Sequence, residues 1–331
     1  MPSNTPIQRI FLASIAGIAV VNVAVLLNVH FGFSFSALGR AMVPAALFAA
    51  IALLVRRFGM HKLSAGLLGV AAIGLAVQLT VPLTYGAVSA GGPLADDALM
   101  AADRAIGFDF SAWVHFVGAQ PVLSAILAYA YNLFVWQVML VPFVLGAFCG
   151  LSEALRFTLG YLLIVTVASF IAVFVPSYGA YVAAGFGPGD LAHIDLNMLL
   201  GYIPAIDDLR AGSFAVYRAD AFQGLLVFPS VHAAMGVLFA RSSLRVPYFG
   251  IFLVPLNLLL IASTPSHGGH FLVDTIAGVA LGFATFVALD RLPSRRRTQS
   301  PADRAGKDTE TPSARATRRP QAAEPAERVP A

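Results

Sequence analysis

The stretch that decides the fold is "TIAGVALGFATFVAL" (Thr275–Leu289), which follows directly on "STPSHGGHFLVD" (Ser263–Asp274). With its flanks this apolar run is long enough to cross the hydrocarbon core of a bilayer as a helix. The helix nevertheless begins with His270 and Asp274, one turn apart on one face. Ionisable groups at membrane depth cost roughly 2.5–3.5 kcal/mol each, so they indicate a function or a buried partner.

The composition extends this interpretation to the whole chain of 331 residues. Hydrophobic residues make up 58% and charged residues 11%, against about a quarter charged in an ordinary soluble domain. We therefore expect an all-α, polytopic membrane helix bundle. The single Cys149 excludes an internal disulfide and a cysteine metal cluster. Nothing favours binding to nucleic acid, because the net charge of +4 comes from the tail after residue 290, with ten Lys/Arg and five Asp/Glu.

Hydropathy and charge together predict about eight spans with both termini in the cytoplasm. Most Lys and Arg residues fall in connections on one side, and most Asp residues fall in the two long connections 87–120 and 183–226 on the other. The first span is too long for a cleaved signal peptide and is expected to remain as an anchor. The expected spans are 10–31, 38–55, 64–86, 121–148, 157–182, 227–243, 246–264 and 269–290.

Three regions follow from this pattern. Residues 1–120 hold the first spans and an interfacial helix at 101–117, and residues 121–290 form a catalytic membrane bundle. A second interfacial helix is expected at 196–212. Residues 291–331 lack aromatics and are rich in Pro, Ala and Arg, so we expect a disordered basic tail that anchors the topology.

The predicted topology brings three polar helix ends to the outer interface. They are "FVPSYGAY" at the end of the fifth span, "FPSVHAA" at the start of the sixth and "GGHFLVD" at the start of the eighth. His270 and Asp274 are spaced i, i+4 and can touch. The carboxylate would orient the imidazole, as in a hydrolase triad. A pair that merely stabilises the span start explains these two residues equally well.

The sixth span adds a second group of the same kind. Ser230 is expected to cap this helix, and His232 follows two residues later. Gly268 and Gly269 would let a ligand approach the backbone, and free N–H groups at a helix start favour phosphate. A nucleophilic His270, an acidic His232 and amide-rich helix ends describe phosphoryl transfer without a metal or cofactor.

These residues carry a family resemblance. "PSVH" followed by "STPSHGGHFLVD" resembles motifs two and three of the type 2 phosphatidic acid phosphatase superfamily, P-S-G-H and S-R-x5-H-x3-D. The match is best to its inositolphosphotransferase branch, similar to inositol phosphorylceramide synthases, with F-P-S-x-H and G-G-H-Y-x-x-D. Firm similarity covers about residues 226–280, and weaker similarity extends back to Tyr129–Gln137 and Val175–Tyr181.

The resemblance implies roles for individual residues. His270 would attack phosphorus to form a phosphohistidine, Asp274 would orient it, His232 would protonate the leaving oxygen and Ser230 would hold phosphate. The sequence departs from the phosphatase pattern: Val231 replaces the motif Gly, Thr264 replaces the phosphate-binding Arg, and the first motif, K-x6-R-P, is absent. Further candidates to contact phosphate are Arg218, Arg210, His267 and Thr264.

The resemblance implies an enzyme of the cell (inner) membrane with its site on the extracytoplasmic face and a phospholipid or lipid phosphate as substrate. Water as acceptor would make it a phosphatase, and a lipid or sugar hydroxyl a phosphotransferase; Thr264 and "GGHFLVD" favour transfer. Two other classes stay open: a proton-coupled transporter, and a silent lipid-binding protein. The sequence contains no visible inverted repeat, which argues against the transporter. It leaves the oligomeric state open.

Overall fold

The chain folds almost entirely into helices, as expected. The computed structural model describes residues 5–28, 32–219 and 223–292, so the predicted tail, apart from its first two residues, lies outside the described residues. The one sheet in this part of the chain is a short parallel pair, β1 (Gly32–Phe33) and β2 (Val216–Tyr217). Everything else of regular structure is α-helix, which confirms the all-α class.

Among the described residues, six helices are long and apolar enough to cross a membrane, which makes the chain a multi-pass membrane protein. A seventh crossing is possible if α5 (Phe110–Gly118) and α6 (Pro121–Asn132), which meet at 107°, count as one broken span. The six are α1 (Pro6–Asn28), α2 (Phe35–Arg57), α3 (His61–Ala90), α8 (Leu151–Phe174), α13 (Phe249–Gly268) and α14 (Leu272–Asp290).

The structure differs from the eight expected spans at two places. The expected span 121–148 is divided between α6 and α7 (Phe134–Cys149), which are separated at Leu133. The expected span 227–243 contains only α12 (Val231–Ser243), whose 13 residues rise about 20 Å. That length falls short of the roughly 30 Å of a bilayer core, so α12 alone does not meet the length criterion.

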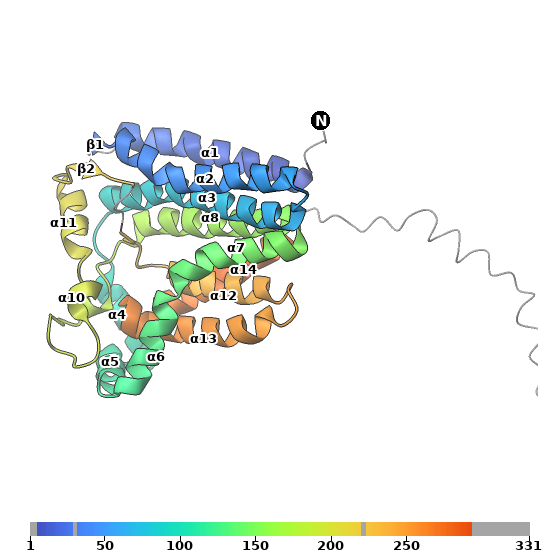
Figure 1. Ribbon diagram of the computed structural model, residues 1–331. Coiled ribbons are helices and arrows are strands. Elements are labelled where there is room, and N and C mark those ends of the chain that lie inside the picture. Colours follow the sequence, from blue (N-terminus) through green and yellow to red (C-terminus); the bar gives the residue numbers. More distant parts are fainter. Residues whose placement is uncertain (1–4, 29–31, 220–222, 293–331) are drawn as a thin grey trace, which may run out of the picture. The chain divides into compact units, whose positions relative to one another are not determined.

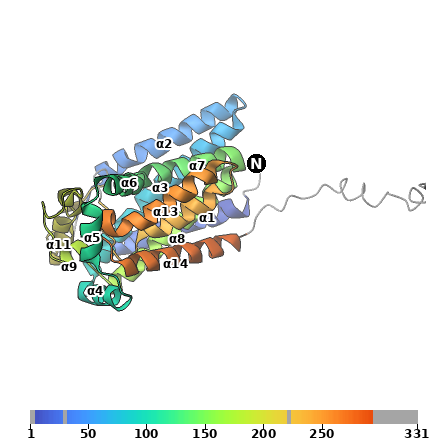
Figure 2. The same cartoon turned by 90° about the horizontal axis from the view of Figure 1, so that it is seen from below.

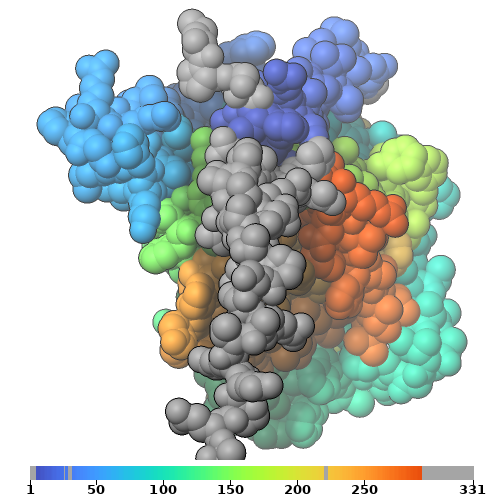
Figure 3. Space-filling model, turned by 90° about the vertical axis from the view of Figure 1, so that its right-hand side faces the viewer, coloured from blue at the N-terminus to red at the C-terminus, as the bar shows by residue number. Residues whose placement is uncertain are grey.

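The short helices gather at one end of the helix bundle. They are α4 (Asp96–Ala105), α5, α9 (Ala180–Ala183), α10 (Leu196–Leu199) and α11 (Ile203–Ala211), and they lie at the left in Figures 1 and 2. Each expected interfacial helix is therefore two shorter ones, α4 with α5 and α10 with α11. Figure 3 faces the opposite end, where the α2–α3 turn (light blue), the α12–α13 turn (orange) and the end of α14 (red-orange) lie.

Glycine brings α12 and α14 into close contact. A Cβ atom on Gly278 would lie 2.3 Å from the Ser230 carbonyl oxygen, and one on Gly282 would lie 2.6 Å from that of Ala234. The two glycines are four residues apart and form a G-x-x-x-G face, which lets helix backbones approach each other closely in membranes. The crossing places the start of α12 directly on the first turns of α14.

A buried polar pair links α7 to α13. The Asn257 side-chain amide donates to Gln137 Oε1 at 2.7 Å and to the Leu253 carbonyl at 2.8 Å. Both side chains are almost fully buried. Gln137 therefore makes a helix–helix hydrogen bond.

Candidate active site

His270 and Asp274 meet at the start of α14. His270 Nδ1 lies 3.5 Å from Asp274 Oδ2, and both side chains are buried. This is an ion-pair distance; Nδ1 has no hydrogen-bond partner among the described residues. The Phe271 N–H donates to Asp274 Oδ2 at 3.0 Å and holds the carboxylate in place. The expected i, i+4 contact is confirmed, and it leaves Nε2 as the nitrogen of His270 that faces away from Asp274.

The turn before His270 depends on two glycines. Gly269 ends α13 with φ +67°, a left-handed conformation that favours glycine. A Cβ atom on Gly268 would lie 2.8 Å from His270 Cδ2 and 2.9 Å from Tyr131 Cε2. The absence of a side chain at Gly268 therefore lets the Tyr131 and His270 rings approach this turn. The groups that approach the backbone at Gly268 are thus the side chains of Tyr131 and His270, where the sequence suggested a ligand.

His232 stands at the start of α12, between two aromatic rings. Ser230 is the N-cap, as expected, and its Oγ accepts from the Ala233 N–H at 3.3 Å. The Tyr131 ring stacks on His232 with centroids 4.4 Å apart, and the Phe134 centroid lies 4.2 Å away. The Tyr131 hydroxyl is 3.4 Å from His232 Nδ1. These contacts fix the plane of the imidazole.

The two imidazoles face one another across the helix crossing. Their ring centroids are 6.5 Å apart. The Ser230 N–H donates to the Asp274 carbonyl at 3.1 Å, which joins the start of α12 to the first turn of α14. His232 and His270, 38 residues apart in sequence, are thus close enough to contact one phosphate group together.

The segment after α8, which includes α9, supplies the third polar segment, as the sequence indicated. The Ala180 N–H donates to the Gly269 carbonyl at 2.9 Å, and the Tyr181 hydroxyl donates to the Ser266 carbonyl at 2.6 Å. Tyr181 is buried, so its ring packs inside the protein. Burial raises the pKa of Tyr181, which keeps its hydroxyl protonated as a donor.

The first amides of α14 are occupied, which corrects the expectation of a free helix start. The Leu272 N–H donates to Asp103 Oδ2 at 2.9 Å and the Val273 N–H to Asp103 Oδ1 at 2.8 Å. Asp103 lies on α4 and is fully buried. The sequence alone does not single out this residue. Its only signal was an acidic side chain on an amphipathic helix, and the contact spans 169 positions.

The start of α12 differs from that of α14. The N–H groups of Ala233 and Ala234 bind Ser230, whereas those of Val231 and His232 have no hydrogen-bond partner within residues 5–28, 32–219 and 223–292. Two backbone donors therefore stand next to the His232 ring. A helix start of this kind attracts an anion.

Two residues proposed to contact phosphate, Thr264 and His267, have hydrogen-bonding partners within the protein. Thr264 is fully buried inside α13; its hydroxyl lies 2.8 Å from that of Thr275 and donates to the Ile261 carbonyl. His267 lies in the last turn of α13 rather than in a loop, with Nδ1 3.0 Å from Ser266 Oγ and Nε2 3.3 Å from Ser124 Oγ. Both sets of contacts join the helices around the site.

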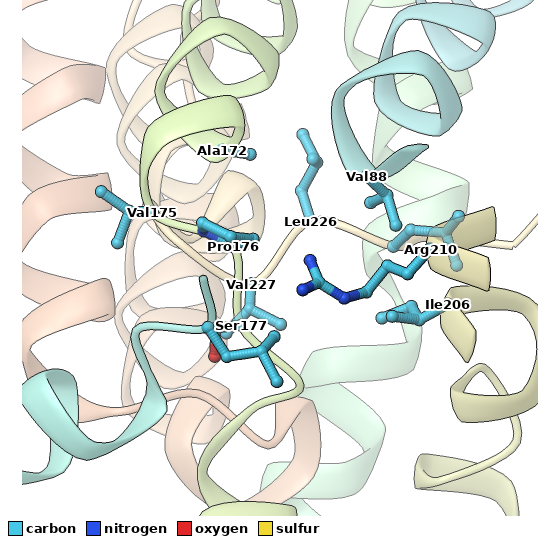
Figure 4. A pocket seen from close by; sticks show the side chains of 11 residues that line it. Val88, Ala172, Val175, Pro176, Ser177, Ile206, Arg210, Leu226 and Val227 are labelled. Carbon is cyan, nitrogen blue, oxygen red and sulfur yellow. The ribbon is translucent and has the colours of Figure 1, made fainter. Parts of the chain in front are cut away.

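The candidate arginines lie in the outer connections. The Arg210 guanidinium projects into a small pocket beside Ser177 and Val227 (Figure 4). Its Nη2 donates to the Gly92 carbonyl at 3.0 Å, and its Nη1 is buried without a hydrogen-bond partner in the part of the chain described. The pocket has room for roughly one water molecule. Arg218 is exposed and directly follows β2.

The part of the chain that forms this site also matches a known protein family. A family model described as the PAP2 superfamily matches residues 97–288, more than half of the chain. The match begins in α4 and ends in α14, so it includes Asp103, His232, His270 and Asp274. Searches of curated proteins and of solved structures find no match.

Proposed function

This chain belongs to the PAP2 superfamily, and from that premise we propose that it is an integral-membrane enzyme of phosphoric ester chemistry with a phosphohistidine intermediate. Superfamily membership supports a phosphatase or phosphotransferase acting on a lipid phosphate at a membrane. The finer proposal is a transferase similar to the inositolphosphotransferase branch. Its site would lie on the extracytoplasmic face of the cell membrane.

In the first step His270 Nε2 attacks the phosphorus of a phospholipid. The new N–P bond forms as the P–O bond to the lipid alcohol breaks, and the departing oxygen takes a proton from His232. Asp274 holds the His270 ring and balances the positive charge that develops on it. The phosphate would be held by the free N–H groups of Val231 and His232 and by the Ser230 hydroxyl.

In the second step an acceptor hydroxyl attacks the phosphohistidine. His232, now unprotonated, removes the hydroxyl proton, the new O–P bond forms and the N–P bond breaks to restore His270. A lipid or sugar hydroxyl as acceptor gives transfer, and water gives hydrolysis. Thr264 in place of the phosphatase arginine favours transfer, because its hydroxyl is engaged between helices and supplies no charge for a free phosphate.

The observation that carries the proposal is the 6.5 Å separation of the His232 and His270 rings, with Asp274 behind His270. Three groups of the types that phosphoryl transfer needs converge from two helices. A transporter that relays protons would not need the second imidazole next to unpaired helix-start amides.

The test uses purified full-length protein in phospholipid vesicles with a lipid labelled by ³²P in its headgroup phosphate, with and without ceramide or diacylglycerol. We expect label on the protein that survives alkali and is lost in acid. Acceptor lipid should convert it to a new labelled phospholipid. His270→Ala should lower turnover on the order of a thousandfold or more and abolish the labelled protein.

The matched control is His61→Gln, at the exposed start of α3 at the other end of the bundle. This variant should keep full activity. Product formation by His270→Ala at the wild-type rate would overturn the phosphohistidine mechanism. Labelled water-soluble phosphate with no lipid product would assign hydrolysis in place of transfer.

A further inference from the structure

Asp103 is a buried acid outside the groups assigned to the reaction. It belongs to α4, yet its two carboxylate oxygens each accept one N–H from the first turn of α14, at 2.9 and 2.8 Å. Its exposed fraction is 0%. Burial raises the pKa of Asp103, while the two backbone N–H bonds act in the opposite direction. Both carboxylate oxygens of Asp103 thus bind backbone amides two and three residues after His270.

The amides that Asp103 binds lie within the site itself, so the contact does more than satisfy the N–H groups at the start of a helix. Leu272 and Val273 lie between His270 and Asp274, so the Asp103 carboxylate holds the short segment that carries both groups. The Phe271 N–H is held by Asp274 itself. All three amides between the histidine and its carboxylate partner thus have acceptors, which fixes the path of the chain through this turn.

The same contact decides where an anion can bind. A free helix start attracts phosphate, but at α14 the donors are engaged by a carboxylate whose charge repels an anion. At α12 the Val231 and His232 N–H groups are unpaired within the described residues. The two neighbouring helix starts therefore differ in their attraction for phosphate, and Asp103 produces the difference.

We propose that Asp103 is a positioning residue, which orients the turn carrying His270 and excludes phosphate from the start of α14, so that phosphorus is presented to His270 from the α12 side. This inference rests on the proposed phosphohistidine chemistry. Asp103 touches no substrate in this role; it acts through the backbone of Leu272 and Val273.

The test compares Asp103→Asn with wild type by the single-turnover rate constant for labelling of the protein. This rate constant is independent of the fraction of correctly folded enzyme, so a loss of stability alone does not change it. We expect it to fall on the order of 10- to 100-fold, because small displacements of a nucleophile have effects of that size. The KM for the lipid should change by less than about threefold, since the donors on α12 are retained.

Inhibition by inorganic phosphate gives a second readout. Asp103→Asn removes the repelling charge and one acceptor at α14, so phosphate should inhibit this variant at a lower concentration than wild type. Asp97→Asn, an exposed neighbour on α4, is the matched control and should behave as wild type in both assays. Should Asp103→Asn fail to fold, Asp103→Glu keeps the charge and moves the oxygens by one methylene, and it should also lower the rate constant.

The outcomes separate the two proposals. An active wild type with an unchanged rate constant and unchanged phosphate inhibition in Asp103→Asn would overturn the role of Asp103 alone. Where Asp103→Asn does not fold, an unchanged rate constant in Asp103→Glu would do the same. A wild type that forms no labelled protein would overturn the proposed function, and the positioning role with it.

Discussion

At the scale of single residues, Tyr131 is the group that most directly controls His232. Its ring lies parallel to the imidazole at 4.4 Å, and its hydroxyl is 3.4 Å from Nδ1. A hydroxyl that accepts from Nδ1–H keeps one proton on Nδ1, so Nε2 is the nitrogen that gives a proton to the leaving oxygen and is bare in the neutral ring. The stacked ring sets the orientation, and the hydroxyl sets the tautomer.

Tyr131→Phe separates these two effects, because it keeps the ring and removes only the hydroxyl. We expect kcat to fall by roughly 2- to 10-fold, the value of one net hydrogen bond, with little change in KM. Turnover of the labelled lipid at saturating substrate measures this. Tyr129→Phe, two residues away and exposed, serves as the control. A Tyr131→Phe enzyme with wild-type kcat would show that the hydroxyl does not determine the tautomer of His232.

The sequence predicted the contacts within single helices and, through the topology, the meeting of His232 with His270, but it did not predict the contact made by Asp103. His270 with Asp274 and the Ser230 cap follow from spacings within one helix turn, which helical geometry fixes. Asp103 and Tyr131 reach the site only through tertiary packing, 169 and 101 residues away from their partners. No periodicity in the sequence encodes such a contact.

At the scale of elements, the crossing of α12 and α14 determines whether the two histidines meet. Gly278 lies against the Ser230 carbonyl, so a side chain there would push the cap of α12 away from α14. The Ser230 N–H bond to the Asp274 carbonyl would be lost in the same movement. The position of His232 relative to His270 therefore depends on a glycine one turn beyond Asp274.

Gly278→Ala tests this dependence. The added methyl would lie 2.3 Å from backbone oxygen, which cannot yield as a side chain can. We expect a loss of stability of about 1–3 kcal/mol and a fall in activity larger than the loss of folded protein. Thermal unfolding in detergent measures the loss of stability, and the single-turnover rate constant measures the loss of activity. Gly39→Ala on α2, with nothing within 4 Å, should be neutral; equal behaviour of both variants would contradict the crossing argument.

Hydropathy predicted the long helices well and the broken ones poorly. An apolar window detects that a segment is hydrophobic, and α1, α2, α3, α8, α13 and α14 are regular along their length. It does not detect the interruption at Leu133 or the non-helical lead-in before Ser230, because both lie within equally apolar sequence. The site uses both irregular elements, since Tyr131 lies before the first break and His232 follows the second.

At the scale of the whole described unit, charge is divided between the two ends of the bundle. In the α12–α13 turn, Arg245 pairs with Glu153 at 2.7 Å and with Asp290 at 3.4 Å, and Arg156 of α8 donates to the Leu289 carbonyl. This turn lies at the end of the bundle shown in Figure 3. These contacts join α8, the α12–α13 turn and α14. The expected cytoplasmic side is this end, and the histidines lie towards the other.

The single Cys149 provides a direct test of this orientation. It is exposed at the end of α7, on the end we expect to be cytoplasmic. A membrane-impermeant maleimide should label it in inverted vesicles and leave it unlabelled in intact cells. In a Cys149→Ser background, Ser213→Cys, exposed after α11, should give the reverse pattern. Labelling of Cys149 from outside intact cells would place the histidines on the cytoplasmic side.

The contact between Asp103 of α4 and the start of α14 also has a consequence for biosynthesis of the protein. The acid belongs to an early segment and both amides to the final helix of the described unit, so the reactive centre stays unfinished through most of synthesis. A nascent chain that stops before Leu272 contains Asp103 but not the two amides that it binds, and it should be inactive. The ribosome and the insertion machinery would thus place an inactive intermediate in the bilayer. The protein would become active only when α14 has been inserted.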